Sequence, residues 1–145
     1  MTRSIYVAGK MRGLPLFGFP AFDEAATKLR ADGWFVYSPA EHDRRVGFDP
    51  SGPPPDAKTL AEMHSWDFTV IAAADAIYML PGWEDSDGAT RELDVARACG
   101  LDVYWADDTR ADPTKWTSGP LRASGNTPHA HRTRPPSVPT GTAPL

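Results

Sequence analysis

The chain has 145 residues, enough for one domain with a hydrophobic core, and its 41% hydrophobic and 23% charged residues are ordinary for a globular protein. The formal net charge of −4 argues against a nucleic-acid polymer as the main partner, although a single nucleotide needs only a local pocket. The single cysteine, Cys99, excludes an internal disulfide framework and a cysteine-based zinc site.

Apolar runs and helical patterns alternate along the chain from its first residues. The expected elements, in chain order, are a strand at residues 4–8, a helix at 22–29, a strand at 34–37, a helix at 59–74, a strand at 75–80, a helix at 88–99 and a strand at 101–105. Residues 44–56 are rich in glycine and proline and are expected to form a long loop. Strands that alternate with helices predict a parallel α/β sheet with right-handed crossovers.

The C-terminal part of the chain has a different composition. Seven prolines fall between Pro113 and Pro144, among serine, threonine, glycine, histidine and arginine. Such a segment has too few apolar groups to offset the entropy lost on ordering. We therefore expect a folded domain at residues 1–106 and a proline-rich, disordered tail at residues 107–145.

The chain shows no feature of export or of membrane insertion. No signal peptide precedes the first strand-like run, and no apolar stretch approaches the length needed to cross a bilayer. The expected location is therefore the cytoplasm, with no membrane partner.

Glu92 is the first candidate for a functional residue. It shares a helix face with Ala89, Ala96 and Cys99, at spacings of three, four and seven residues. The helix follows a strand, and open α/β sheets keep their ligand crevices at that level. The free N–H groups of a helix start favour an ionised carboxylate, so Glu92 is expected to stay charged. Acids are also common in the first turn of any helix, which is the ordinary explanation.

Two further residues are expected near Glu92. Asp67 lies on the apolar face of the helix at residues 59–74, where an acid either lines a cleft or needs a buried partner. Tyr6 lies in the first strand, and most such tyrosines are core residues with a hydrogen-bonded hydroxyl. Its strand ends two residues later, on the same rim of the sheet as Glu92.

Loop residues on that rim offer cations, a helix cap and an aromatic ring. Lys10 and Arg12 follow the first strand, and arginine matches phosphate oxygens in geometry, although most loop cations are simply solvated. Ser86, before Gly88, is either a helix N-cap or a phosphate ligand. Trp83 could stack on a base, or it could cover the sheet edge.

Other kinds of site find little support in the sequence. Glu41-His42-Asp43 is a cluster of potential metal ligands without a second half, so no metal and no cofactor are expected. The glycines after the first strand are not followed by the Gly-Lys-Ser/Thr of a Walker loop, and no nucleophile elbow is present.

Taken together, these residues resemble a known family. The 2'-deoxynucleoside 5'-monophosphate N-hydrolases, of the nucleoside 2-deoxyribosyltransferase superfamily, start with Y-x-x-G-x-[IM]-R-G, and this chain has Tyr6-Val7-Ala8-Gly9-Lys10-Met11-Arg12-Gly13. Asp67, Asp75 and Ser86-x-Gly88-x-x-x-Glu92 follow in the order and spacing of that family. The whole of residues 4–105 is similar to an uncharacterised, often phage-encoded branch with the pattern I-Y-x-A-G-P-M…N-P-A-E…D…L-P-G-W-x-x-S-x-G-A-x-x-E.

The resemblance implies a flavodoxin-like or Rossmann-like three-layer sandwich and a homodimer whose site is completed by the neighbouring subunit. It implies that Glu92 is the nucleophile, that Asp67 helps the base to leave and that Tyr6 orients the nucleophile. It implies that Arg12 and Ser86 bind the phosphate. Further candidates for substrate binding, which lie near them on the same rim, are Gly9, Lys10, Trp83 and Gly88. Two features depart from the family's pattern. Lys10 replaces the usual proline, and Ser118 is only a weak match to the residue that the partner subunit contributes to the site in the family.

The expected activity is hydrolysis of the N-glycosidic bond of a (deoxy)nucleoside 5'-monophosphate. A carboxylate would capture the anomeric carbon, while Asp67, in a more apolar setting, would hold its proton longer and protonate the leaving base. Two alternatives stay open: a deoxyribosyltransferase that exchanges bases, and a nucleotide-binding protein without turnover. The transferases carry an acid at the position of Ser86, so this serine favours nucleotides over nucleosides.

Overall fold

Four parallel strands form the centre of the domain. The computed structural model describes residues 2–106, so the expected tail, with Ser118, lies outside the described residues. The strands are β1 (Ser4–Ala8), β2 (Phe35–Tyr37), β3 (Ala76–Met79) and β4 (Asp102–Trp105), and they lie in the order β2-β1-β3-β4. Every neighbouring pair is parallel, as the alternation of strands and helices predicted.

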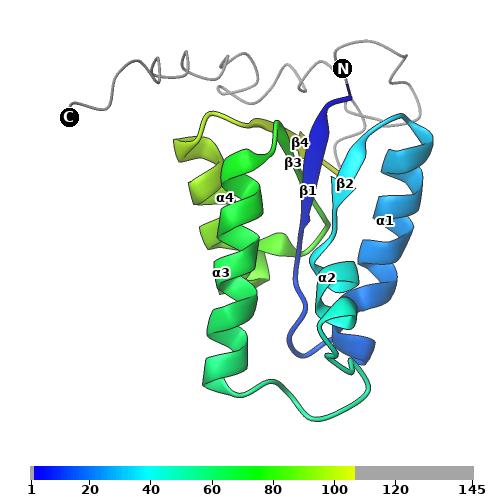
Figure 1. Ribbon diagram of the computed structural model, residues 1–145, viewed down its shortest axis with the longest axis vertical. Helices are drawn as coiled ribbons and strands as arrows, with labels where there is room; N and C mark the ends of the chain where they lie inside the picture. Colours follow the sequence, from blue (N-terminus) through cyan, green and yellow to red (C-terminus); the bar gives the residue numbers. More distant parts are fainter. Residues whose placement is uncertain (1, 107–145) are drawn as a thin grey trace, which may run out of the picture.

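Helices cover both faces of the sheet (Figure 1). They are α1 (Phe19–Ala31), α2 (Pro39–Arg45), α3 (Ala57–Ala73) and α4 (Asp87–Ala98), with short 3-10 turns η1 (Pro15–Gly18) and η2 (Trp83–Asp85). In Figure 1, α1 and α2 lie on one side of the strands and α3 and α4 on the other, which confirms the three-layer α/β sandwich. None of the helices in residues 2–106 is both long enough and apolar enough to span a membrane.

The strands alternate their side chains between two hydrophobic cores. Ile5 and Val7 of β1 pack in the core beneath α1, whereas Tyr6 and Ala8 pack in the core beneath α3 and α4. This alternation follows from the two-residue period of a strand. It places the Tyr6 side chain on the face of the sheet that carries Asp67 and Glu92 (both buried).

Helix α2 was not expected from the sequence. It has seven residues, begins at Pro39 and ends at Arg45, so it includes Arg44 and Arg45 from the start of the expected loop. Its surface is tied to α1 by ion pairs, among them Arg30 to Glu41 at 2.6 Å. So short and polar a segment lacks the repeated apolar spacing that marks a longer helix.

The sheet order creates a crevice at the carboxyl ends of β1 and β3. From β1 the chain continues towards α1 on one face, and from β3 it continues towards α4 on the other, which is the topology that opens a ligand crevice in α/β sheets. Gly9 ends β1 at this point. A Cβ at Gly9 would lie 2.9 Å from the Cβ of Leu80, so only glycine lets the two strand ends approach this closely.

Candidate active site

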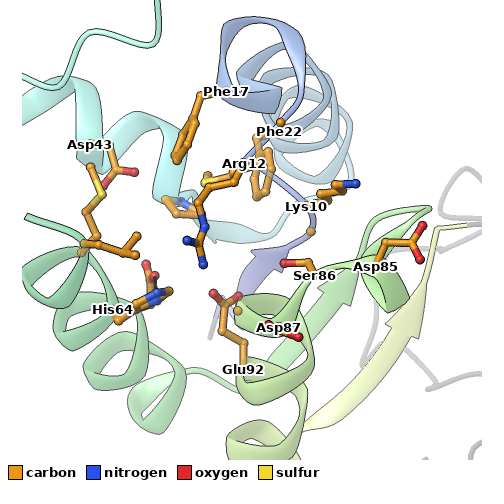
Figure 2. A pocket seen from close by; sticks show the side chains of 18 residues that line it. Lys10, Arg12, Phe17, Phe22, Asp43, His64, Asp85, Ser86, Asp87 and Glu92 are labelled. Atoms are coloured by element: carbon orange, nitrogen blue, oxygen red, sulfur yellow. Dashed lines mark ion pairs between the residues drawn. The ribbon is translucent and has the colours of Figure 1, made fainter. Parts of the chain in front are cut away.

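A cavity of about 520 Å³ lies at these strand ends (Figure 2). One side, here called the loop side, consists of residues 9–13 after β1 and residues 85–88 at the start of α4. The opposite side, here called the helix side, consists of Asp43 from α2 and four residues of α3: Leu60, Met63, His64 and Asp67. Glu92 of α4 lines the same cavity, and Figure 2 shows its carboxylate turned towards the centre.

Glu92 and Asp67 meet at this cavity. Both carboxyl groups belong to buried residues, with 7% and 6% of their surfaces exposed. His64 Nδ1 lies 3.7 Å from Asp67 Oδ2, one helical turn away. One donor atom from each of these three side chains lies within 4.8 Å of the others. The structure therefore brings together the two acids that were predicted from separate helices.

Tyr6 completes this group from the sheet. Its side chain is fully buried, and within residues 2–106 its hydroxyl makes no hydrogen bond of regular geometry. Burial and then the neighbouring charges of Glu92 and Asp67 raise the pKa of Tyr6 well above its ordinary value. The hydroxyl thus keeps its proton and can donate it in a hydrogen bond to either carboxylate.

Burial disfavours the charged state that we expected for Glu92. Burial and then the charge of Asp67 raise the pKa of Glu92 well above its ordinary value, against an opposing contribution from the Tyr6 hydroxyl. Helix α4 begins at Asp87 with Ser86 as its cap, so Glu92 lies in the second turn. The free N–H groups of the helix start are therefore out of its reach, and desolvation dominates.

Asp43 and His64 are site residues that were not predicted from the sequence. Asp43 is 2% exposed, and its Oδ1 atom has no hydrogen-bond partner among the described residues. Burial, and then the charge of Asp67, raise the pKa of Asp43 to about 7. The spacing of three residues between His64 and Asp67 was a usable signal. Asp43 gave none, because its helix was not expected.

The loop side carries the predicted polar residues. Ser86 caps α4, since its Oγ accepts a hydrogen bond from the N–H of Ala89 at 3.1 Å, which confirms the N-cap interpretation. Figure 2 shows the guanidinium of Arg12 directed into the cavity and the amine of Lys10 directed away from its centre. Gly88 and Gly9 also line the cavity, so these predicted residues of the two loops border the same space.

Trp83 and Asp75 lie elsewhere. Trp83 is absent from the lining of this cavity and packs on Trp105, with ring centroids 5.5 Å apart, so it covers the sheet edge. Asp75 lies at the amino end of the sheet, where its carboxylate accepts a hydrogen bond from the backbone N–H of Ser4 at 2.9 Å. The aromatic residues that do line the cavity are Phe17 and Phe22.

The cluster of His64, Asp67 and Glu92 has the composition of a metal site as well as that of an acid-base site. His64, Asp67 and Glu92 offer one nitrogen and two carboxylate oxygens close enough to touch a common cation. Zinc and manganese accept such ligands. No metal was expected from the sequence, and activity in the presence of a chelator separates the two chemistries.

The chain belongs to a family without an assigned activity. Residues 3–105, which include the whole sheet and every residue of the cavity, match the family described as Domain of unknown function (DUF4406). No curated protein matches the chain.

Proposed function

We propose that this protein hydrolyses the N-glycosidic bond of a (deoxy)nucleoside 5'-monophosphate and releases the free base. The observation that carries the proposal is the meeting of Glu92 and Asp67 in one cavity with Arg12 and the start of α4, with the buried hydroxyl of Tyr6 close to both carboxyl groups. Paired carboxyl groups in retaining glycosidases lie about 5 Å apart, close enough for one to attack while the other handles the proton. One oxygen of Glu92 and one of Asp67 lie within 4.8 Å of each other, which is close enough for that division of roles.

The raised pKa of Glu92 defines how the reaction would start. Glu92 must be ionised to attack, and an oxygen of Asp67, which lies within 4.8 Å of the Glu92 carboxyl group, would accept its proton. Transfer of this one proton leaves Glu92 as the nucleophile and Asp67 as the acid. The Tyr6 hydroxyl then stabilises the new charge on Glu92 by donating a hydrogen bond.

The chemical step follows from these roles. A Glu92 oxygen forms a bond to the anomeric carbon as the carbon–nitrogen bond breaks, and the electron pair of that bond passes to the base nitrogen. Asp67 gives its proton to the base. Water, deprotonated by Asp67, then attacks the anomeric carbon, releases the sugar phosphate and restores Glu92.

The loop side would hold the phosphate. Arg12 directs its guanidinium into the cavity, and the helix start at Ser86 offers N–H groups and a positive dipole end. Both features favour a dianionic group there, so the phosphate would lie on the loop side and the sugar over Glu92. We also infer a homodimer, because the resembling enzymes complete this kind of site with a residue from the partner, and sedimentation measurements test it.

The deciding experiment is incubation of the full chain with a panel of nucleoside 5'-monophosphates and the matching nucleosides, followed by chromatography for free base. We expect base release from monophosphates, at a rate unaffected by a chelator. Addition of a second free base should give no new nucleotide, since exchange would identify a transferase. Absence of free base from every substrate would overturn the proposal, and loss of release with chelator would assign His64, Asp67 and Glu92 to a metal.

A further inference from the structure

The two sides of the cavity differ in chemistry, and a nucleotide has two ends that differ in the same way. Figure 2 shows Asp43 across the cavity from Lys10 and Ser86, with the Glu92 carboxylate between the two sides. If the phosphate lies on the loop side and the sugar over Glu92, the base reaches the helix side. This inference therefore rests on the nucleotide specificity of the proposed function, but it does not depend on turnover.

Apolar side chains of the cavity offer surfaces for the face of a base. Phe17, Phe22, Leu60 and Met63 line the cavity with apolar groups. Phe17 has φ 54° and ψ 30°, a left-handed conformation that costs free energy in a residue other than glycine. Its ring nevertheless contacts Phe48, with centroids 5.1 Å apart, and faces the cavity. A base stacks on such a ring irrespective of its identity.

Asp43 and His64 are the polar groups of the helix side that the catalytic steps do not use, and Asp43 is the more deeply buried of the two. Asp43 is 2% exposed, its Oδ1 has no hydrogen-bond partner within residues 2–106, and it lines the cavity. A buried polar atom without a partner costs free energy unless a ligand supplies the partner. The hydrogen-bonding edge of a base is such a partner.

We propose that Asp43 selects the base, by pairing its carboxyl group with the edge of a base that stacks near Phe17. As a carboxylate, Asp43 offers two acceptors and matches two adjacent N–H donors, the pattern that guanine presents. As a neutral carboxylic acid it offers one donor and one acceptor, the pattern that adenine and cytosine complement. The charge state of one side chain would therefore decide which base is preferred.

Groups from every neighbouring element can change the charge of Asp43. Those that face it or the same cavity are His64 and Asp67 of α3, Asp87 and Glu92 of α4, Asp85 of η2, and Lys10 and Arg12 of the loop after β1. Among these groups, His64 alone carries an imidazole ring. A His64→Gln variant therefore serves as the control for any effect of pH on base preference.

The test measures dissociation constants by calorimetry in the full chain with Glu92→Gln, which prevents turnover. The ligands are 2'-deoxynucleoside 5'-monophosphates of guanine, hypoxanthine, adenine and cytosine, at pH 8.5 and pH 5.5. At pH 8.5 we expect guanine to bind about tenfold or more tightly than adenine, with hypoxanthine between them. At pH 5.5 the affinities for the adenine and cytosine nucleotides should rise relative to the affinity for the guanine nucleotide. This change should occur whether or not His64→Gln is also present.

The decisive variant is Asp43→Asn, which keeps the shape of the side chain and fixes one donor and one acceptor. It should favour adenine over guanine at both pH values. Asp49→Asn makes the same change at an exposed position outside this cavity, so as the matched control it should keep the original order of bases. An unchanged order in Asp43→Asn overturns the inference. If the order changes but the unmodified protein releases no base, the inference holds and the hydrolase proposal fails; if no nucleotide binds, both fail.

Discussion

The loop side and the helix side of the cavity place charge in opposite ways. On the loop side, Lys10 is half-buried and Arg12 is exposed, and both belong to a turn that follows β1. On the helix side, Asp43 and Asp67 are buried close together, and burial raises the pKa of Asp43. The loop side also contains the exposed acids Asp85 and Asp87, so Arg12 and the helix start are the features that favour an anion there. The helix side instead contains a buried carboxyl group, that of Asp43, which is costly to charge. Binding and chemistry thus make separate demands on one cavity, and each can be disturbed alone.

The strongest effect we expect is the loss of chemistry without loss of the fold. Glu92→Gln removes the nucleophile but keeps its size, so base release should fall by about a hundredfold or more. Free base measured by chromatography checks the rate, and circular dichroism checks the fold. Asp94→Asn, at an exposed position on the same helix, is the matched control and should keep its rate. A folded Glu92→Gln protein with near-normal turnover would remove Glu92 from the mechanism.

A second change separates the two acids of the cavity. Asp67→Asn removes the proton donor, so release of an ordinary purine should fall by roughly a hundredfold. Release of the base from a 7-methylguanine nucleotide should slow much less, because this base leaves without being protonated. Glu62→Gln on the exposed face of α3 is the control. Equal losses for both substrates would contradict the role of Asp67 as the acid.

Substitutions on the loop side should weaken substrate binding rather than slow the chemical step. Arg12→Ala should raise KM for the monophosphate by about 10–100-fold and leave the nucleoside unaffected, because a charge-assisted contact contributes roughly 1.5–3 kcal/mol. Lys10→Ala is the matched control, since its amine points away from the cavity centre, and its KM should change much less. Equal effects of the two variants would show that only the net charge of the loop matters.

The mildest effect concerns stability on the helix side. The pKa of Asp43 is about 7 in the folded protein against a usual 3.8, so the unfolded chain releases this proton first as pH rises. The free energy of unfolding should therefore fall between about pH 4 and pH 7 and stay lower above that range. Asp43→Asn removes this fall and should stabilise the protein at pH 8 by about 1–2 kcal/mol, after allowance for solvent screening. Urea denaturation at pH 5 and pH 8 measures it, and an equal change at both values would contradict the assignment.

The sequence predicted the sheet, three of the helices and the loop side well, because these depend on patterns between near neighbours. β1 was predicted at the residues where it occurs, and the Ser86 cap follows from its position before a helix. Glu92 and Asp67 were recognised as inward acids because each lies on an apolar helix face.

The helix side could not be predicted in the same way. Asp43 reaches the cavity only because α2 packs between α1 and α3, and neither that packing nor α2 itself leaves a periodic pattern. The surroundings of Glu92 were missed for a related reason. Sequence position suggested a helix start, whereas desolvation by the packed core controls the proton.

The strand order has a consequence for how the domain forms. β1 is synthesised before the other three strands of this sheet, yet it lies between β2 and β3. It cannot be enclosed until β3 has been made, and Glu92 follows later still. Parallel pairing between such distant segments is slow, because loop closure precedes the contacts that stabilise it. Nascent chains that end before β3 would thus expose an unpaired, apolar edge of β1, which makes this stage of synthesis the one most open to chaperones and to aggregation.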